Sequence, residues 1–192
     1  MAIWQYRLTA LPAAGIRRRC GHLPARLFID HEARKQHWAA PPADSLAAPA
    51  IDDAYTTDWW EGVSVVGAPV AAQIDQLIQR AAWSKPESWS WKGNEDHQQD
   101  HDCWISVRPN AHTIEEFQFR TDLRDVSKAA AFLLPMLGLC QQYDLLVLDA
   151  QGRLMPPDLA AVYPSIKESS AVRFLTSPQQ FLAQVLREQK GR

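Results

Sequence analysis

The chain has 192 residues, and its hydrophobic fraction of 46% excludes wholesale disorder and supplies enough apolar side chains for a packed core. A formal net charge of −2 excludes the strong overall positive field of many nucleic-acid-binding proteins, so we expect no nucleic-acid partner. The three cysteines are widely spaced and form no CxxC pair, which is typical of a protein in a reducing cytosol rather than of a disulfide framework.

Two short strands are predicted near the N-terminus. Apolar and polar residues alternate over residues 3–8, and residues 25–30 form a second candidate strand that could pair with the first as a hairpin. Between them, the consecutive arginines of residues 17–19 favour a solvent-exposed turn or strand edge, with a phosphate contact as the alternative.

The next segment contains an extended connection and the first predicted helix. Residues 39–50 are rich in alanine and proline, which favours an extended connection. Trp59 and Trp60 follow; because neighbours in regular structure point in different directions, we expect one of them at the surface. Residues 69–83 carry apolar side chains at helical spacing, and Lys85-Pro86 ends this helix.

The central stretch, residues 89–123, predicts a meander of two or three strands. Residues 104–108 and 113–120 alternate between apolar and polar side chains, and Pro109-Asn110 breaks the ladder between them. A long apolar helix follows over residues 125–143, with Asp125 or Ser127 as its cap and Pro135 as an expected kink. Residues 145–149 and 153–155 favour strands, and residues 159–166 and 178–187 favour helices.

This order of elements predicts one α+β domain over residues 1–192, with an antiparallel or mixed sheet and helices packed on one face. Residues 1–66 supply N-terminal strands and the connection, and residues 67–192 supply the helix–meander–helix–strand core. No apolar run approaches 18 residues and the N-terminus is a poor secretory signal, so we expect a cytoplasmic protein without a membrane partner.

The segment from Asp96 to Cys103 is the sharpest candidate for chemistry. In a helix, His97 and His101 would share one face and could chelate zinc with Cys103 or a carboxylate. No HExxH motif or second Cys/His pair supports that site, and a polar hairpin leading into a strand is the alternative. Because no nucleotide-binding or catalytic signature occurs, we expect no cofactor and no enzymatic activity.

Acidic and aromatic residues are dense in this region without forming a catalytic pattern. Such a surface suits binding to a basic protein, because charge steers the encounter and aromatic rings supply contact area. An ordinary solvated loop over a tryptophan-rich core is the alternative. The candidate partner-binding residues are Asp96, Asp100, Asp102, Glu115, Glu116 and Trp91.

Several segments resemble one protein family. They are IWQYR at residues 3–7, DHDCWISV at 100–107, EEFQFRTDLRD at 115–125, LLVLDAQGRLMPP at 145–157 and SSAVRFLTSPQQFL at 169–182. Together they resemble bacterial immunity proteins of polymorphic-toxin and type VI secretion systems. The resemblance is convincing over residues 89–182 and covers the first 80 residues only at IWQYR.

The resemblance implies a non-enzymatic α+β protein that binds a cognate secreted toxin and occludes its active site. A toxin acting in the cytoplasm would have a basic surface if it were a nuclease, since nuclease active sites hold phosphate. The acidic residues named above would then imitate the charge of the substrate. A metal-dependent protein using His97, His101 and Cys103, and a sensor with a pocket between the long helix and the sheet, are the alternatives.

Overall fold

The computed structural model describes residues 2–39, 51–110 and 112–190. The predicted connection over residues 39–50 lies, except for its first residue, outside this part of the chain. The elements run in the order β1 (Gln5–Pro12), α1 (Ala13–Cys20), α2 (His31–Ala39), α3 (Gly67–Ile74), β2 (Ser88–Lys92), the 3-10 turn η1 (Glu95–His97), β3 (Asp102–Val107), β4 (Ile114–Asp122), α4 (Val126–Gln142), β5 (Leu145–Asp149), β6 (Leu154–Met155), α5 (Leu159–Glu168), α6 (Ser170–Thr176) and α7 (Pro178–Lys190).

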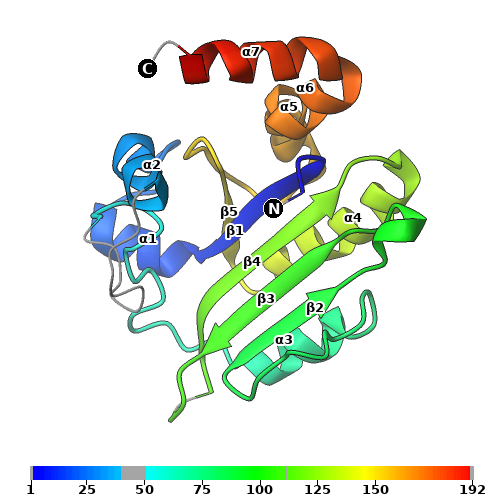
Figure 1. Ribbon diagram of the computed structural model, residues 1–192. Helices are drawn as coiled ribbons and strands as arrows, with labels where there is room; N and C mark the ends of the chain where they lie inside the picture. The colour runs from blue at the N-terminus through cyan, green and yellow to red at the C-terminus, as the bar shows by residue number, and fades with distance from the viewer. Residues whose placement is uncertain (1, 40–50, 111, 191–192) are drawn as a thin grey trace.

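Six strands of the described chain form one sheet in the order β2-β3-β4-β1-β5-β6, and every neighbouring pair is antiparallel. The predicted meander is therefore β2, β3 and β4 (Figure 1). β1 lies between β4 and β5, which run parallel to each other and are joined through α4. A crossover helix of this kind leaves room for one strand between the two it connects, and the N-terminal strand fills that place.

Helices α3 and α4 cover one face of the sheet, and the core lies between these layers (Figure 1). The alternation predicted for β3 is confirmed, because its side chains are buried and half-buried in turn. Asp125 caps α4 through a hydrogen bond that its side chain accepts from the Lys128 amide (3.1 Å). The predicted α+β class, with its antiparallel sheet, is confirmed.

Two predictions for the N-terminal part were wrong. Residues 17–19 form the last turn of α1 rather than a turn or strand edge, although their side chains are exposed as expected. A cation at a helix C-terminus is favoured by the helix dipole, and Gly21 ends the helix with a positive φ of 75°. Residues 25–30 make no hairpin with β1; Arg26 forms a single bridge to Arg153 beside β6.

Trp59 and Trp60 are both buried, so the expectation that one lies at the surface was wrong. They belong to an irregular segment, in which successive side chains need not point to opposite sides. The Trp59 indole N–H donates to the Ala54 carbonyl at 2.7 Å, which satisfies its polar group inside the core. The helix predicted over residues 69–83 is shorter than expected and ends at Ile74.

Helices α5, α6 and α7 lie beyond one end of β1 (Figure 1). A buried chain of hydrogen bonds ties α5 to the sheet, since the Tyr6 hydroxyl donates to Ser165 Oγ at 2.8 Å and that hydroxyl donates to Asp149. No helix in the described part of the chain is both long and apolar enough to cross a membrane.

Candidate functional site

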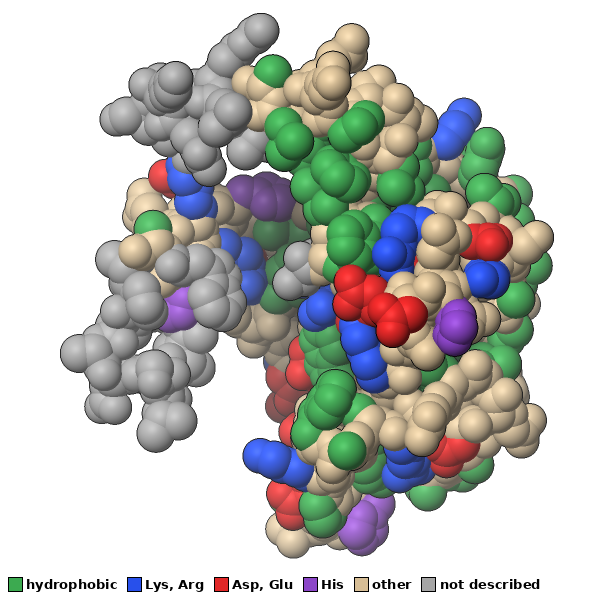
Figure 2. Space-filling model, turned by 45° about the vertical axis from the view of Figure 1, so that its right-hand side comes forward, with side chains coloured by type: hydrophobic (Ala, Val, Ile, Leu, Met, Phe, Trp, Pro, Cys, Tyr) green, Lys and Arg blue, Asp and Glu red, His purple; other side chains and the backbone are tan. Residues whose placement is uncertain are grey.

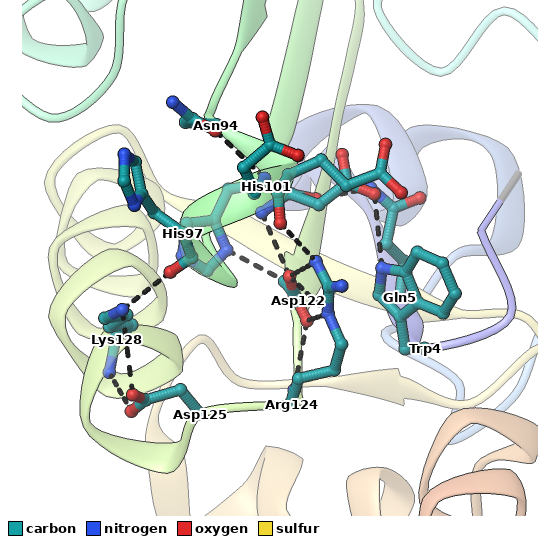
Figure 3. Close-up of polar contacts among 12 residues, drawn as sticks. Trp4, Gln5, Asn94, His97, His101, Asp122, Arg124, Asp125 and Lys128 are labelled. Atoms are coloured by element: carbon teal, nitrogen blue, oxygen red, sulfur yellow. Dashed lines mark hydrogen bonds and ion pairs between the residues drawn. The ribbon is translucent and has the colours of Figure 1, made fainter.

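The predicted acidic segment is a tight loop at one end of the sheet (Figure 3). It contains η1, which Asn94 caps by accepting a hydrogen bond from the Asp96 amide at 2.9 Å. The loop closes on itself at Gly93, where an added Cβ would lie 1.9 Å from the Gln99 carbonyl oxygen. Only glycine permits this approach, so the loop conformation depends on that position.

Asp122 fastens this loop to β4. It accepts the Asp100 amide at 3.0 Å and the Arg124 guanidinium at 2.7 Å, and its side chain is fully buried (Figure 3). Burial alone would raise the pKa of Asp122, but the hydrogen bonds from Arg124 and from the Asp100 amide outweigh it and lower the pKa. The carboxylate is therefore a structural anion that holds two segments together.

Asp100 and Asp102 are also committed to internal ion pairs. Asp100 is 2% exposed and pairs with Lys92, and Asp102 lies 3.4 Å from Arg120 and 3.7 Å from Lys92. Burial raises the pKa of Asp102, and the two neighbouring cations oppose that rise. The structure thus neutralises these two carboxylates within the fold, which removes them from the predicted contact surface.

The two histidines do not form the predicted chelating pair. η1 ends at His97 and the next residue, Gln98, has a positive φ of 54°, so no helical i, i+4 face exists here. His101 is buried and stacked on Phe132 at 4.5 Å, and its Nδ1 accepts the Asp122 amide at 3.0 Å. Within residues 2–39, 51–110 and 112–190, no three Cys, His, Asp or Glu side chains are grouped to hold a metal.

Trp91 is a core residue rather than a surface anchor. It is 1% exposed, and its indole N–H donates to Asp75 at 2.8 Å. The register explains this placement, because Trp91 pairs with Cys103 on the face covered by helices. Trp104 lies on the opposite face beside Ser90, is half-buried, and lines a hollow together with Trp83, which is 64% exposed.

Of the three predicted acids that remain, Asp96 is exposed in η1. The side of β2, β3 and β4 opposite to the helices, here called the open face, carries the other two, Glu115 and Glu116. The register of β3 and β4 shifts between Ser106 and Val107, so that Ser106 faces Glu116 while Val107 faces Ile114. Glu115 is the extra residue of this β-bulge. Neighbouring strand residues normally point to opposite faces, but the bulge places Glu115 and Glu116 along one hollow.

This hollow, here called the open-face cleft, has a volume of about 320 Å³ and lies between the sheet and residues 54–60. Figure 2 shows the molecule hollowed between its N-terminal segment and the sheet. Ion pairs hold the outer wall: Arg34 binds the buried Asp53 carboxylate, and Arg108 lies 2.8 Å from Asp58. The cleft is therefore part of the fixed tertiary structure.

The floor of the open-face cleft is polar and incompletely hydrogen-bonded. Thr9 and Gln118 face each other across β1 and β4 and are 5% and 8% exposed. Thr9 Oγ1 and Gln118 Oε1 have no hydrogen-bond partner among the described residues. Sequence reasoning missed both residues, because each one reads as an ordinary polar position of a strand.

Comparison of the chain with protein-family models, with curated proteins and with solved structures found no match.

Proposed function

We propose that this protein is an immunity protein, which binds one cognate secreted toxin and occludes its active site without catalysing a reaction. The observation that carries the proposal is the β-bulge that places Glu115 and Glu116 along a single cleft. Neither carboxylate is paired with a lysine or arginine within the described chain. Two uncompensated charges at a preformed hollow favour a cationic partner.

The open face also supplies contact area for a protein partner. Trp104 and Trp83 line a second hollow of about 260 Å³ on this face, beside β2 and β3. Aromatic side chains are enriched at the centres of protein interfaces because they bury much area at low entropic cost. Trp83 and Trp104 therefore replace Trp91 as the proposed anchors, and the acids that remain are the exposed Asp96 and Glu115 and the half-buried Glu116.

The sequence resemblance to bacterial immunity proteins supports the same conclusion independently of the geometry of the cleft. A basic toxin whose active site holds phosphate, such as a nuclease that acts in the cytoplasm, has the charge that this face attracts. Because the overall charge is only −2, attraction would come from the local arrangement on the open face rather than from the whole molecule.

The test is affinity capture followed by neutralisation. Tagged protein is used to capture partners from the bacterium that encodes it, and the gene of any stoichiometric partner is then expressed alone and together with the protein. A partner that stops growth by itself, and no longer does so when co-expressed, supports the proposal. If no captured protein is toxic and neutralised in this way, the proposal is overturned.

A matched pair of variants locates the binding surface. Glu115→Gln/Glu116→Gln removes both charges from the cleft, whereas Glu32→Gln/Asp144→Asn removes two exposed charges elsewhere. We expect the first variant to bind the partner at least about tenfold more weakly and the second to bind like the wild type. Equal losses of affinity for the partner in the two variants would show that the partner does not bind at the open-face cleft.

A further inference from the structure

We propose that the open-face cleft binds the guanidinium group of an arginine side chain that the partner inserts between the sheet and residues 54–60. The inference rests on the function proposed above and names the chemical group that this site takes. Two independent observations carry it: unpaired carboxylates at the rim and unpartnered polar atoms at the floor.

The floor offers acceptors whose directions are set by their neighbours. The Gln118 amide nitrogen donates to Glu116 Oε1 at 2.6 Å, and a carboxylate can only accept, so the Gln118 oxygen must point away from Glu116. Five buried side-chain atoms of the described chain have no hydrogen-bond partner, and that oxygen and the Thr9 hydroxyl are the two that belong to residues lining the cleft. Buried polar atoms are nearly always satisfied in native proteins, so this pair indicates a missing donor.

The rim adds negative charge to this pair of acceptors. Glu115 and Glu116 line the cleft and have no cationic partner in the described residues, whereas the nearby Asp58 is already paired with Arg108. A ligand that satisfies the cleft must therefore carry several donors and a positive charge. A cation that has N–H donors and no acceptor atoms fits best. The cleft offers mainly acceptor atoms, and of the two floor groups only the Thr9 hydroxyl could also donate a hydrogen bond.

Arginine fits this description better than lysine or a metal ion. A guanidinium group is planar, carries five N–H donors and is weakly hydrated, so it can bond to acceptors on both the floor and the rim at once. Leu11 and Ala54 also line the cleft and provide apolar contact for the methylene stem. A volume of about 320 Å³ lies at the small end of ligand sites, which suits a single inserted side chain.

The first experiment uses the isolated protein and no partner. ¹⁵N-labelled protein is titrated with N-acetyl-arginine methylamide, and the neutral citrulline and the lysine analogues serve as comparisons. We expect the arginine compound to shift the amide resonances of Thr9, residues 54–60 and residues 115–118, with the lysine analogue weaker and the citrulline analogue inactive. Equal responses to arginine and citrulline, or shifts that lie elsewhere, would overturn the inference.

Variants separate the floor from the rim. Thr9→Val removes the floor hydroxyl at nearly constant shape, and Glu116→Gln removes the rim charge; each should weaken arginine binding about tenfold or more. Glu32→Gln, on α2, should bind like the wild type. If Thr9→Val fails to fold, Glu116→Gln alone decides, and unchanged binding by that variant refutes the assignment.

The outcome is distinguishable from the fate of the proposed function. A captured toxin that the protein neutralises, together with no binding of the arginine compound, would overturn the arginine inference and leave the immunity proposal standing. Cleft-specific arginine binding without any neutralised toxin would overturn the immunity proposal and leave the arginine site standing.

Discussion

Replacing Asp122 by asparagine tests the hydrogen-bond network that fastens residues 93–101 to the sheet. Asp122 Oδ2 accepts the Asp100 amide at 3.0 Å and Arg124 Nη2 at 2.7 Å, while Oδ1 accepts the Arg124 amide at 3.0 Å. In the variant, one oxygen can keep the Arg124 amide, but the new NH₂ group then faces the Asp100 amide. Two donors would point at each other inside the protein.

The expected loss follows from these contacts. A buried hydrogen bond to a charged group contributes about 1.5–3 kcal/mol, and the orphaned Asp100 amide adds the cost of an unsatisfied donor. Arg124 is partly exposed, so the loss of its ion pair adds little. We expect Asp122→Asn to lower the free energy of unfolding by about 2–4 kcal/mol at pH 7.

Urea unfolding followed by tryptophan fluorescence measures this loss, because the chain contains eight tryptophans and several are buried. The pKa of Asp122 is lowered in the folded protein, so its contribution is present above the ordinary value of 3.8 and is lost as the pH falls through the folded pKa. The difference in stability between wild type and variant should therefore narrow below about pH 4.

Asp96→Asn is the control, since Asp96 is exposed in the same loop and is not ion-paired within the described chain. It should change stability by less than about 0.5 kcal/mol. If Asp122→Asn is as stable as this control at pH 7, the hydrogen bonds accepted by Asp122 do not stabilise the loop. That result would contradict the structural role assigned to Asp122.

Two further predictions concern buried titratable groups. Burial lowers the pKa of His101, against the opposing effect of Asp122, so its NMR titration midpoint should lie below 6.5. The protein should therefore lose stability as the pH falls from 6.5 through that midpoint. A midpoint at or above 6.5 would contradict the stacked, buried placement of His101. Burial also raises the pKa of the Cys103 and Cys140 thiols, so a thiol reagent should label only Cys20 in the native protein and all three cysteines in urea. Rapid native labelling of Cys103 would show that the core opens.

Local patterns in the chain were sufficient for the fold class. β3, β4 and β5 and helix α4 were predicted near their observed places, because side-chain periodicity and capping by Asp125 are properties of neighbouring residues. Helices α2 and α6 were missed; each is short, and the apolar repeat of α2 is weak. The three arginines of residues 17–19 were assigned to a turn because charge alone does not distinguish a turn from the end of a helix.

The candidate site could be predicted only in part. Glu115 and Glu116 were identified from charge, but their common orientation depends on a bulge that forms only when β4 pairs with β3. Asp100 and Trp91 were expected at the surface and are internal, since their partners, Asp122 and Asp75, lie 22 and 16 positions away along the chain.

The sequence by itself thus determined the central strands, the long helix α4 and which residues carry charge. Tertiary structure decided the place of β1 between β4 and β5, the burial of the aspartates, and the cleft that joins Thr9 to residues 54–60 and 115–118. The physical reason is that periodicity acts between near neighbours, whereas strand pairing and ion pairing join residues that only the folded chain brings together.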